Sequence, residues 1–102
     1  MGQSKLLDYL PEDRRDKLQT VAIMAYELGD ISKCIIYGNG ALKIGNLVRA
    51  KILNTEAKMA LADLITQCRI MCEHLDCSWE ETSDLGEERF LYRCQEIKDK
   101  LI

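Results

Sequence analysis

Aromatic residues and proline are scarce in this 102-residue chain. Phe, Trp and Tyr together make up 6% of it, with one Phe, one Trp and one Pro, whereas 47% of the residues are hydrophobic. Strand-rich domains depend on aromatic and β-branched side chains and on many turn residues, so this composition predicts an all-α fold. The length predicts a single domain, residues 1–102, in which residues 1–9 form a loosely ordered lead-in.

Long apolar runs and basic clusters are also lacking. No run reaches the length of a membrane span, and the first residues contain no apolar signal segment, so we expect no membrane partner and a cytoplasmic location. The 14 Lys and Arg residues are interspersed with 17 Asp and Glu residues, which gives a net charge of −3. This distribution does not favour binding to a nucleic acid polymer.

The five cysteines include no CxxC pair, and the chain has a single histidine. Structural zinc normally uses paired Cys/His knuckles, and carboxylate-bridged di-iron bundles use Glu-x-x-His pairs, so neither metal centre is favoured. In a reducing compartment free cysteines are among the most buried residues. We therefore expect the cysteines in the core, and His74 near the C-terminal end of a helix as a cap.

The first long helix is predicted to begin at Pro11-Glu12-Asp13 and to extend to about Tyr37. Pro suits a first helical turn, and acidic residues there face the positive end of the helix dipole. Gly38-Asn39-Gly40 is predicted to end the helix. Apolar residues recur at steps of three and four and define an expected core stripe, namely Leu18, Val21, Ala25, Leu28, Ile31 and Ile35.

Two further long helices are predicted after this break. Residues 41–49 hold either a short helix or an ordered crossover, and the second long helix begins between Arg49 and Thr55 and ends at Leu75. Arg49 and Lys51 are interpreted as ordinary surface charge; the alternative is that they close over a polyphosphate. Ser78, followed three residues later by Glu81, is a capping box that predicts a third helix over about 79–100.

Carboxylates interrupt an otherwise apolar stripe on each of the first two helices. On the first helix the stripe is Ile23, Glu27, Asp30, Cys34 and Tyr37, and on the second it is Glu56, Ala60, Asp63, Gln67, Ile70 and His74. Their spacing of three and four residues puts each set on one side of its helix. A buried carboxylate is costly unless it is paired or binds a metal, and Mg²⁺ prefers oxygen ligands. If Asp63 is half-buried, as we expect, these acids converge on Mg²⁺; the alternative is that they face solvent.

The segment AYELGDISK, residues 25–33, resembles the ExxE motif of the MazG-like all-α nucleoside triphosphate pyrophosphohydrolases. The segment LADLITQ, residues 61–67, is similar to the end of the family's ExxD motif, and the resemblance spans roughly residues 17–93. Asp30 stands where Glu is usual, and Ala60 stands where the second motif has its Glu. Glu56, one turn earlier, is a candidate replacement.

This resemblance implies a MazG-like bundle of three to four helices, completed by association into a homodimer or a dimer of dimers. It also implies Mg²⁺, with Mn²⁺ as the alternative, held by Glu27, Asp30 and Asp63, with Glu56 as the fourth candidate ligand. Glu27 and Asp30 are the catalytic candidates, because one carboxylate would orient a water for attack between the α- and β-phosphates.

The implied reaction converts a nucleoside triphosphate or deoxynucleoside triphosphate into a monophosphate and pyrophosphate, a house-cleaning role. Lys33 is a candidate phosphate ligand, although it could equally neutralise Asp30 or face solvent. Tyr37 is a candidate platform for the base. The missing Glu at position 60 leaves a second reading open, in which the chain is a catalytically degenerate helical module for oligomerisation or interaction.

Overall fold

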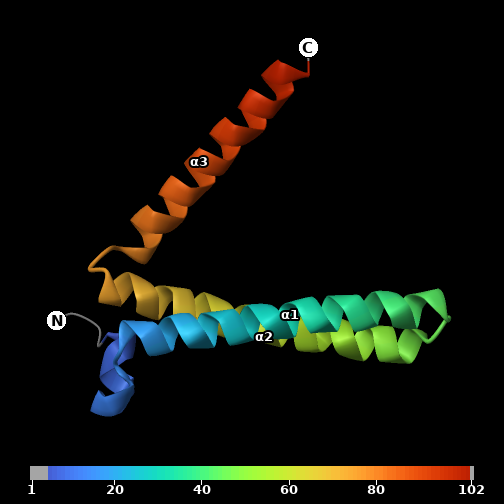
Figure 1. Cartoon of the computed structure of the whole chain (residues 1–102), viewed down its shortest axis with the longest axis horizontal. Helices are drawn as coiled ribbons and strands as arrows, with labels where there is room; N and C mark the ends of the chain where they lie inside the picture. The colour runs from blue at the N-terminus through green and yellow to red at the C-terminus, as the bar shows by residue number, and fades with distance from the viewer. Residues whose placement is uncertain (1–4, 102) are drawn as a thin grey trace.

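The computed structural model describes residues 5–101, and within them it is all-helical (Figure 1). This confirms the predicted all-α class. Two long helices form an antiparallel hairpin, and a third leaves the hairpin at an angle, so that it contacts the hairpin only near its own first turns. The elements are two 3-10 helices, η1 (Leu6–Tyr9) and η2 (Glu12–Arg14), and three α-helices, α1 (Lys17–Lys43), α2 (Leu47–His74) and α3 (Trp79–Lys100).

Within the part of the chain that the structure describes, no helix is both long and apolar enough to cross a membrane.

Helix α1 begins later than predicted. Pro11 precedes only the short η2, and the α-helix begins at Lys17, where the Asp16 carboxylate accepts a hydrogen bond of 3.1 Å from the Leu18 amide. Asp is one of the strongest N-cap residues, because its side chain satisfies an amide that has no partner inside the helix. The proline and its acidic neighbours therefore start one 3-10 turn, and Asp16 starts the long helix.

The predicted helix end at Gly38-Asn39-Gly40 is wrong, because α1 continues through it to Lys43. The chain turns instead at Gly45, whose φ is +76°. Its amide donates to Leu42 O, and the next amide, of Asn46, donates to Ala41 O at 2.9 Å. These two bonds define a Schellman motif, which needs the left-handed conformation that glycine adopts at little cost. Asn46 then caps α2 by accepting a hydrogen bond from the Arg49 amide, so residues 41–46 hold no crossover.

A second Schellman motif joins α2 to α3. Asp76, with φ at 54°, takes the left-handed position, and its amide donates to Glu73 O while the Cys77 amide donates to Cys72 O at 2.9 Å. The predicted cap of α3 is present, since the Glu81 amide donates to Ser78 Oγ. The Ser78 hydroxyl in turn donates to the carboxylate of Glu80 at 3.1 Å.

The lead-in packs against the open end of the hairpin. Residues 1–4 lie outside the described residues, but η1 is held by Glu73, whose two carboxylate oxygens accept hydrogen bonds from the Leu6 and Leu7 amides at 3.0 and 2.9 Å. The loosely ordered lead-in expected for residues 1–9 is thus replaced, from residue 5 onward, by a turn anchored on α2. Its anchor is a side chain 66 residues away, which local sequence does not reveal.

Among the described residues, the buried core is made by α1 and α2. Its buried members are Thr20, Ala41, Leu53, Ala60, Ile70 and Cys72. The stripe expected to be core on the first helix is largely exposed instead: Leu18 is 76% exposed, Leu28 59% and Ile35 51%. The expectation for the cysteines is also wrong as stated, because Cys72 is buried but Cys77 is exposed and the other three are intermediate.

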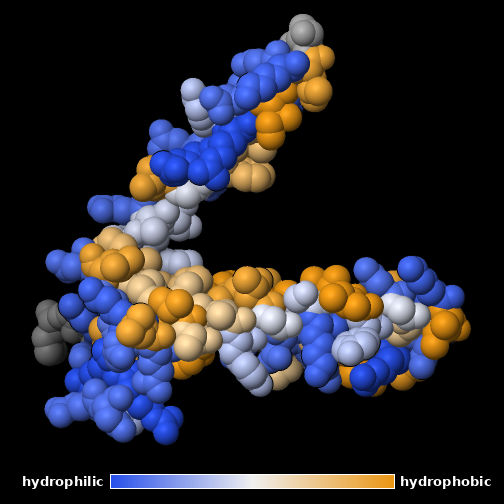
Figure 2. Space-filling model, viewed as in Figure 1, coloured by the Kyte–Doolittle hydropathy of each residue, from blue (hydrophilic) through white to orange (hydrophobic). Residues whose placement is uncertain are grey.

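The total accessible surface is large for a chain of this mass, and many large apolar side chains contribute to it. The accessible surface is 8452 Å². A compact monomer of 11.7 kDa is expected to expose about 5,900 Å². Figure 2 shows apolar patches on both arms, along the edges of α3 and of the hairpin that face each other across the open angle. Each chain therefore has roughly 2,600 Å² of surface beyond that of a compact monomer.

Candidate functional site

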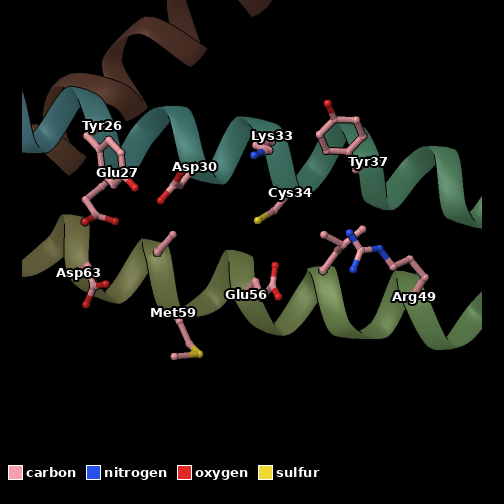
Figure 3. A pocket seen from close by; sticks show the side chains of 12 residues that line it. Tyr26, Glu27, Asp30, Lys33, Cys34, Tyr37, Arg49, Glu56, Met59 and Asp63 are labelled. Carbon is pink, nitrogen blue, oxygen red and sulfur yellow. The ribbon is translucent and has the colours of Figure 1, made fainter.

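An open groove of about 630 Å³ runs along the seam between α1 and α2 (Figure 3). It is lined by side chains of both helices: Tyr26, Glu27, Asp30, Lys33, Cys34, Tyr37, Arg49, Leu53, Glu56, Met59, Ala60 and Asp63. All six residues predicted for catalysis, metal binding or substrate binding are among them. The antiparallel hairpin brings these residues together from two sequence segments, residues 26–37 of α1 and 49–63 of α2.

Glu27, Asp30 and Asp63 gather at one end of the groove. In Figure 3 the Glu27 side chain extends from α1 toward α2, whereas the Asp63 side chain, on α2, points away from α1. Partial burial raises the pKa of Glu27, and the nearby charges of Asp63 and then Asp30 raise it further. Glu27 therefore lies within the electric field of a carboxylate on each helix, an arrangement that disfavours three ionised acids unless a cation is present.

The burial of these acids differs from the expectation in one respect. Glu27 and Asp30 are half-buried, whereas Asp63, expected to be half-buried, is exposed in this single chain. Asp63 lies on the open side of the groove, where its carboxylate retains contact with water. The two acids of α1 are therefore less exposed to water than Asp63.

Ala60 and Glu56 occupy the middle of the groove on α2. Ala60 lies one turn before Asp63 and is 7% exposed, so an apolar methyl group lines the groove where the family pattern has Glu. Glu56 lies seven residues before Asp63, a separation of about 10.5 Å along the helix axis. In Figure 3 it lies across the groove from Cys34, away from Glu27. Glu56 thus lines the groove but stands apart from the three-carboxylate end.

The other end of the groove carries cationic and aromatic side chains. Lys33 is exposed on α1, Arg49 extends into the groove from the first turn of α2, and the Tyr37 ring lies beside them with its hydroxyl pointing away from α2. The sequence favours ordinary surface charge for Arg49, with closure over a polyphosphate as the alternative. A helix that begins at Leu47 instead gives Arg49 a fixed place on the groove wall.

The charges of the groove do not balance. Four carboxylates (Glu27, Asp30, Glu56 and Asp63) face two cationic side chains (Lys33 and Arg49), which leaves a formal charge of −2. A single divalent cation would neutralise it, and a donor set made only of carboxylate oxygens matches the preference of Mg²⁺. Within residues 5–101, no three His, Cys, Asp or Glu side chains are close enough together to hold one ion. The donor chemistry fits Mg²⁺, with side-chain movement or water needed to complete the coordination.

His74, predicted as a helix cap, lies at the last position of α2, far from the acids. Its Nε2 is 2.9 Å from the hydroxyl of Thr20, so it ties the C-terminal end of α2 to the N-terminal end of α1.

In comparisons with protein-family models, curated proteins and solved structures, the chain matches none of them.

Proposed function

We propose that this chain is a cytoplasmic, Mg²⁺-dependent nucleotide pyrophosphohydrolase of the MazG-like type. In this proposal it cleaves a nucleoside or deoxynucleoside triphosphate to a monophosphate and pyrophosphate, and Mn²⁺ can replace Mg²⁺. The observation that carries the proposal is that Glu27, Asp30 and Asp63 line one groove, where burial and the carboxylates of Asp63 and Asp30 raise the pKa of Glu27. Like-charged groups held together in a cleft are more typical of functional sites than of helix surfaces.

Each groove residue then has a chemical task. Glu27, Asp30 and Asp63 are the proposed metal ligands, with Glu56 as a further candidate. Bound Mg²⁺ would supply charge neutralisation and positioning, which phosphoryl-type transfer needs more than covalent chemistry. The raised pKa makes the Glu27 carboxylate a better proton acceptor for an attacking water than an ordinary glutamate.

The substrate-binding end of the groove is proposed to take the phosphates and the base. Lys33 and Arg49 provide cations beside the acids, and both can donate to phosphate oxygens. Tyr37, which is 57% exposed, offers a ring face on which a base can stack. Binding at this end would therefore combine charge neutralisation with an aromatic contact.

We further propose that the active form is a homodimer or a dimer of dimers. Two observations support this. The apolar stripe of α1 is exposed in the single chain, and each chain carries about 2,600 Å² more surface than a compact monomer. Obligate interfaces bury about 2,000 to 5,000 Å² in total, or half of that on each partner. The excess is enough for one such interface or for two smaller ones.

The second candidate function is a helical oligomerisation module that has lost catalysis. Ala60 favours it, because a methyl group occupies the groove position at which the family pattern has a metal ligand. In that case the exposed apolar stripes would be the functional surface. Melting in the presence of Mg²⁺ or Mn²⁺ separates the two candidates: ligand at a hundredfold excess over Kd adds about 2.7 kcal/mol of stability.

The direct test is release of pyrophosphate. Purified full-length chain is incubated with Mg²⁺ and a panel of normal and damaged nucleoside triphosphates, beside Glu27→Gln and the matched control Glu87→Gln on the exposed surface of α3. We expect release by the wild type and the control and a loss of at least about a hundredfold in Glu27→Gln, the usual scale for a positioned acid or base. Equal release by all three, or by none with no metal-induced stabilisation, would overturn the proposal.

A further inference from the structure

The turn between α2 and α3 holds two cysteines against each other. In its Schellman motif, Cys77 donates its amide to Cys72 O at 2.9 Å, and Asp76 between them takes the left-handed conformation with φ at 54°. Cys72 and Cys77 occupy the two positions of this motif whose side chains usually make an apolar contact. In this chain both members of that contact are thiols.

The two thiols have different environments. Cys77 is exposed, whereas Cys72 is 7% exposed, and burial followed by the neighbouring Cys77 side chain raises the pKa of the Cys72 thiol. Thiolate character and access govern reaction with oxidants. Cys77 is therefore the thiol that is accessible to an oxidant in solution, and Cys72 is the neighbouring thiol that can react with the oxidised Cys77.

The pair also lies where α3 is attached to the hairpin. Thr82, in the first turns of α3, is close enough to the Cys72 thiol to lower its pKa, and α3 contacts α2 only around this junction. Figure 1 shows α3 leaving the hairpin from this turn without support further along its length. A covalent bond across the turn would fix the segment that sets the direction of α3.

We propose that Cys72 and Cys77 are a redox-sensitive pair that peroxide converts into an intramolecular disulfide across the α2–α3 turn. In the first step the Cys77 thiolate attacks one peroxide oxygen; the S–O bond forms, the O–O bond breaks, and the departing hydroxide takes up a proton as water. The sulfur of Cys77 is now a sulfenic acid.

In the second step the sulfur of Cys72, once deprotonated, attacks the sulfur of Cys77. The S–S bond forms, the S–O bond breaks, and the hydroxide leaves with a proton as the second water. Two thiols lose two electrons in total, and one peroxide is reduced to two waters. A dithiol reductant reverses the reaction by thiol–disulfide exchange.

Peptide mapping of the wild-type chain tests this without any variant. The full chain is treated with hydrogen peroxide, its remaining thiols are blocked with N-ethylmaleimide, and it is digested with trypsin. Cleavage after Arg69 and Arg89 releases one peptide that carries both Cys72 and Cys77 but not Cys68. After peroxide we expect neither cysteine of this peptide to carry N-ethylmaleimide, and the peptide to be lighter than its reduced form by two hydrogen atoms. If dithiothreitol is added before the blocking step, we expect both cysteines to carry N-ethylmaleimide.

Two variants separate the roles of the thiols. In Cys72→Ser we expect dimedone to trap a sulfenic acid at Cys77, whereas Cys94→Ser, a matched control on α3, should form the disulfide as the wild type does. The proposal is overturned if Cys77 cross-links two chains, if Cys68 is the partner of Cys72, or if Cys77 stays reduced at peroxide levels that oxidise Cys94. These readouts concern thiol chemistry alone, so they do not depend on nucleotide hydrolysis.

Discussion

The hydroxyl of Thr20 lies 2.9 Å from Nε2 of His74 and joins the two ends of the helical hairpin. Thr20 is the most buried residue described, at 2% exposed, and it lies on the first turn of α1, whereas His74 is the last residue of α2. A polar contact thus closes the end of the hairpin that is opposite its turn. Beside it, Glu73 holds the lead-in turn through two amides.

Loss of the Thr20 hydroxyl should weaken the hairpin. Thr20→Val keeps the shape of the side chain but leaves His74 without this partner, so we expect a loss of about 1–2 kcal/mol in the free energy of unfolding. The measurement is urea unfolding followed by circular dichroism. Thr55→Val is the matched control, because the Thr55 hydroxyl bonds only to Lys51 O on an exposed face, and we expect a change within about 0.5 kcal/mol. Equal effects of the two substitutions would contradict this role for Thr20.

Two glycines near the end of α1 should respond to alanine in opposite directions. Gly45 has φ at +76°, where an alanine costs about 1–2 kcal/mol. Gly40 is inside α1 and an added Cβ meets nothing within 4 Å, so Gly40→Ala should stabilise by about 0.5–1 kcal/mol. Thermal melting of the two variants beside the wild type measures this. A higher melting temperature for Gly45→Ala would show that the chain turns elsewhere.

The acidic end of the groove should oppose folding when no metal is present. Because the folded-state pKa of Glu27 is raised, the folded chain binds the Glu27 proton more tightly than the unfolded chain does. The stability contributed by this tighter proton binding is fully present below the unfolded-state pKa of Glu27, and it is lost as pH rises through the folded-state pKa. We therefore expect Glu27→Gln to melt at a higher temperature than wild type at pH 7 in EDTA, and the difference to shrink toward pH 4.

Mg²⁺ should reverse that difference by stabilising wild type and leaving Glu27→Gln unchanged. Glu87→Gln is the control for the removal of one charge, and it should follow wild type under both conditions. If Glu27→Gln is less stable than wild type at pH 7 without metal, the Glu27 carboxylate stabilises the folded chain. That result would contradict a repulsive acidic cluster.

Placing an acid at position 60 should strengthen metal binding. Ala60 lines the groove one turn from Asp63, so the longer side chain of Ala60→Glu can extend into the groove as a further oxygen ligand. We expect a smaller dissociation constant for Mn²⁺ by roughly tenfold, equivalent to about 1.4 kcal/mol, and faster pyrophosphate release. Ala57→Glu, one turn earlier on α2, is the comparison variant. Unchanged metal binding in Ala60→Glu would show that a side chain at position 60 does not reach the metal site.

Local sequence predicted what depends on short-range chemistry. The spacing of Glu27, Asp30 and Asp63 placed them on facing stripes, and Ser78 marked the start of α3 correctly. The helix boundaries near Gly38 and Pro11 were wrong, because several residues there can end or start a helix. The chain leaves α1 at Gly45, because there the carbonyls of Ala41 and Leu42 both accept hydrogen bonds from the amides of the turn.

Longer-range features were not available from the sequence. The apolar stripe containing Leu18, Leu28 and Ile35 was expected in the core, but the stripe facing α2 is the one that contains Thr20 and Glu27. Two apolar stripes on one helix look alike in sequence, and only packing decides which of them meets the neighbouring helix. Likewise, Arg49 joined the groove because α2 begins two residues before it.

The central claim is that Glu27, Asp30 and Asp63 share one divalent cation. Calorimetric titration of the metal-free chain with Mg²⁺ tests it most directly, beside Asp63→Asn and the control Glu87→Gln. We expect one ion per chain in wild type and control, and at least tenfold weaker binding in Asp63→Asn, since one ligand charge is lost. Binding of the same strength in Asp63→Asn, or no binding by wild type, would contradict the claim.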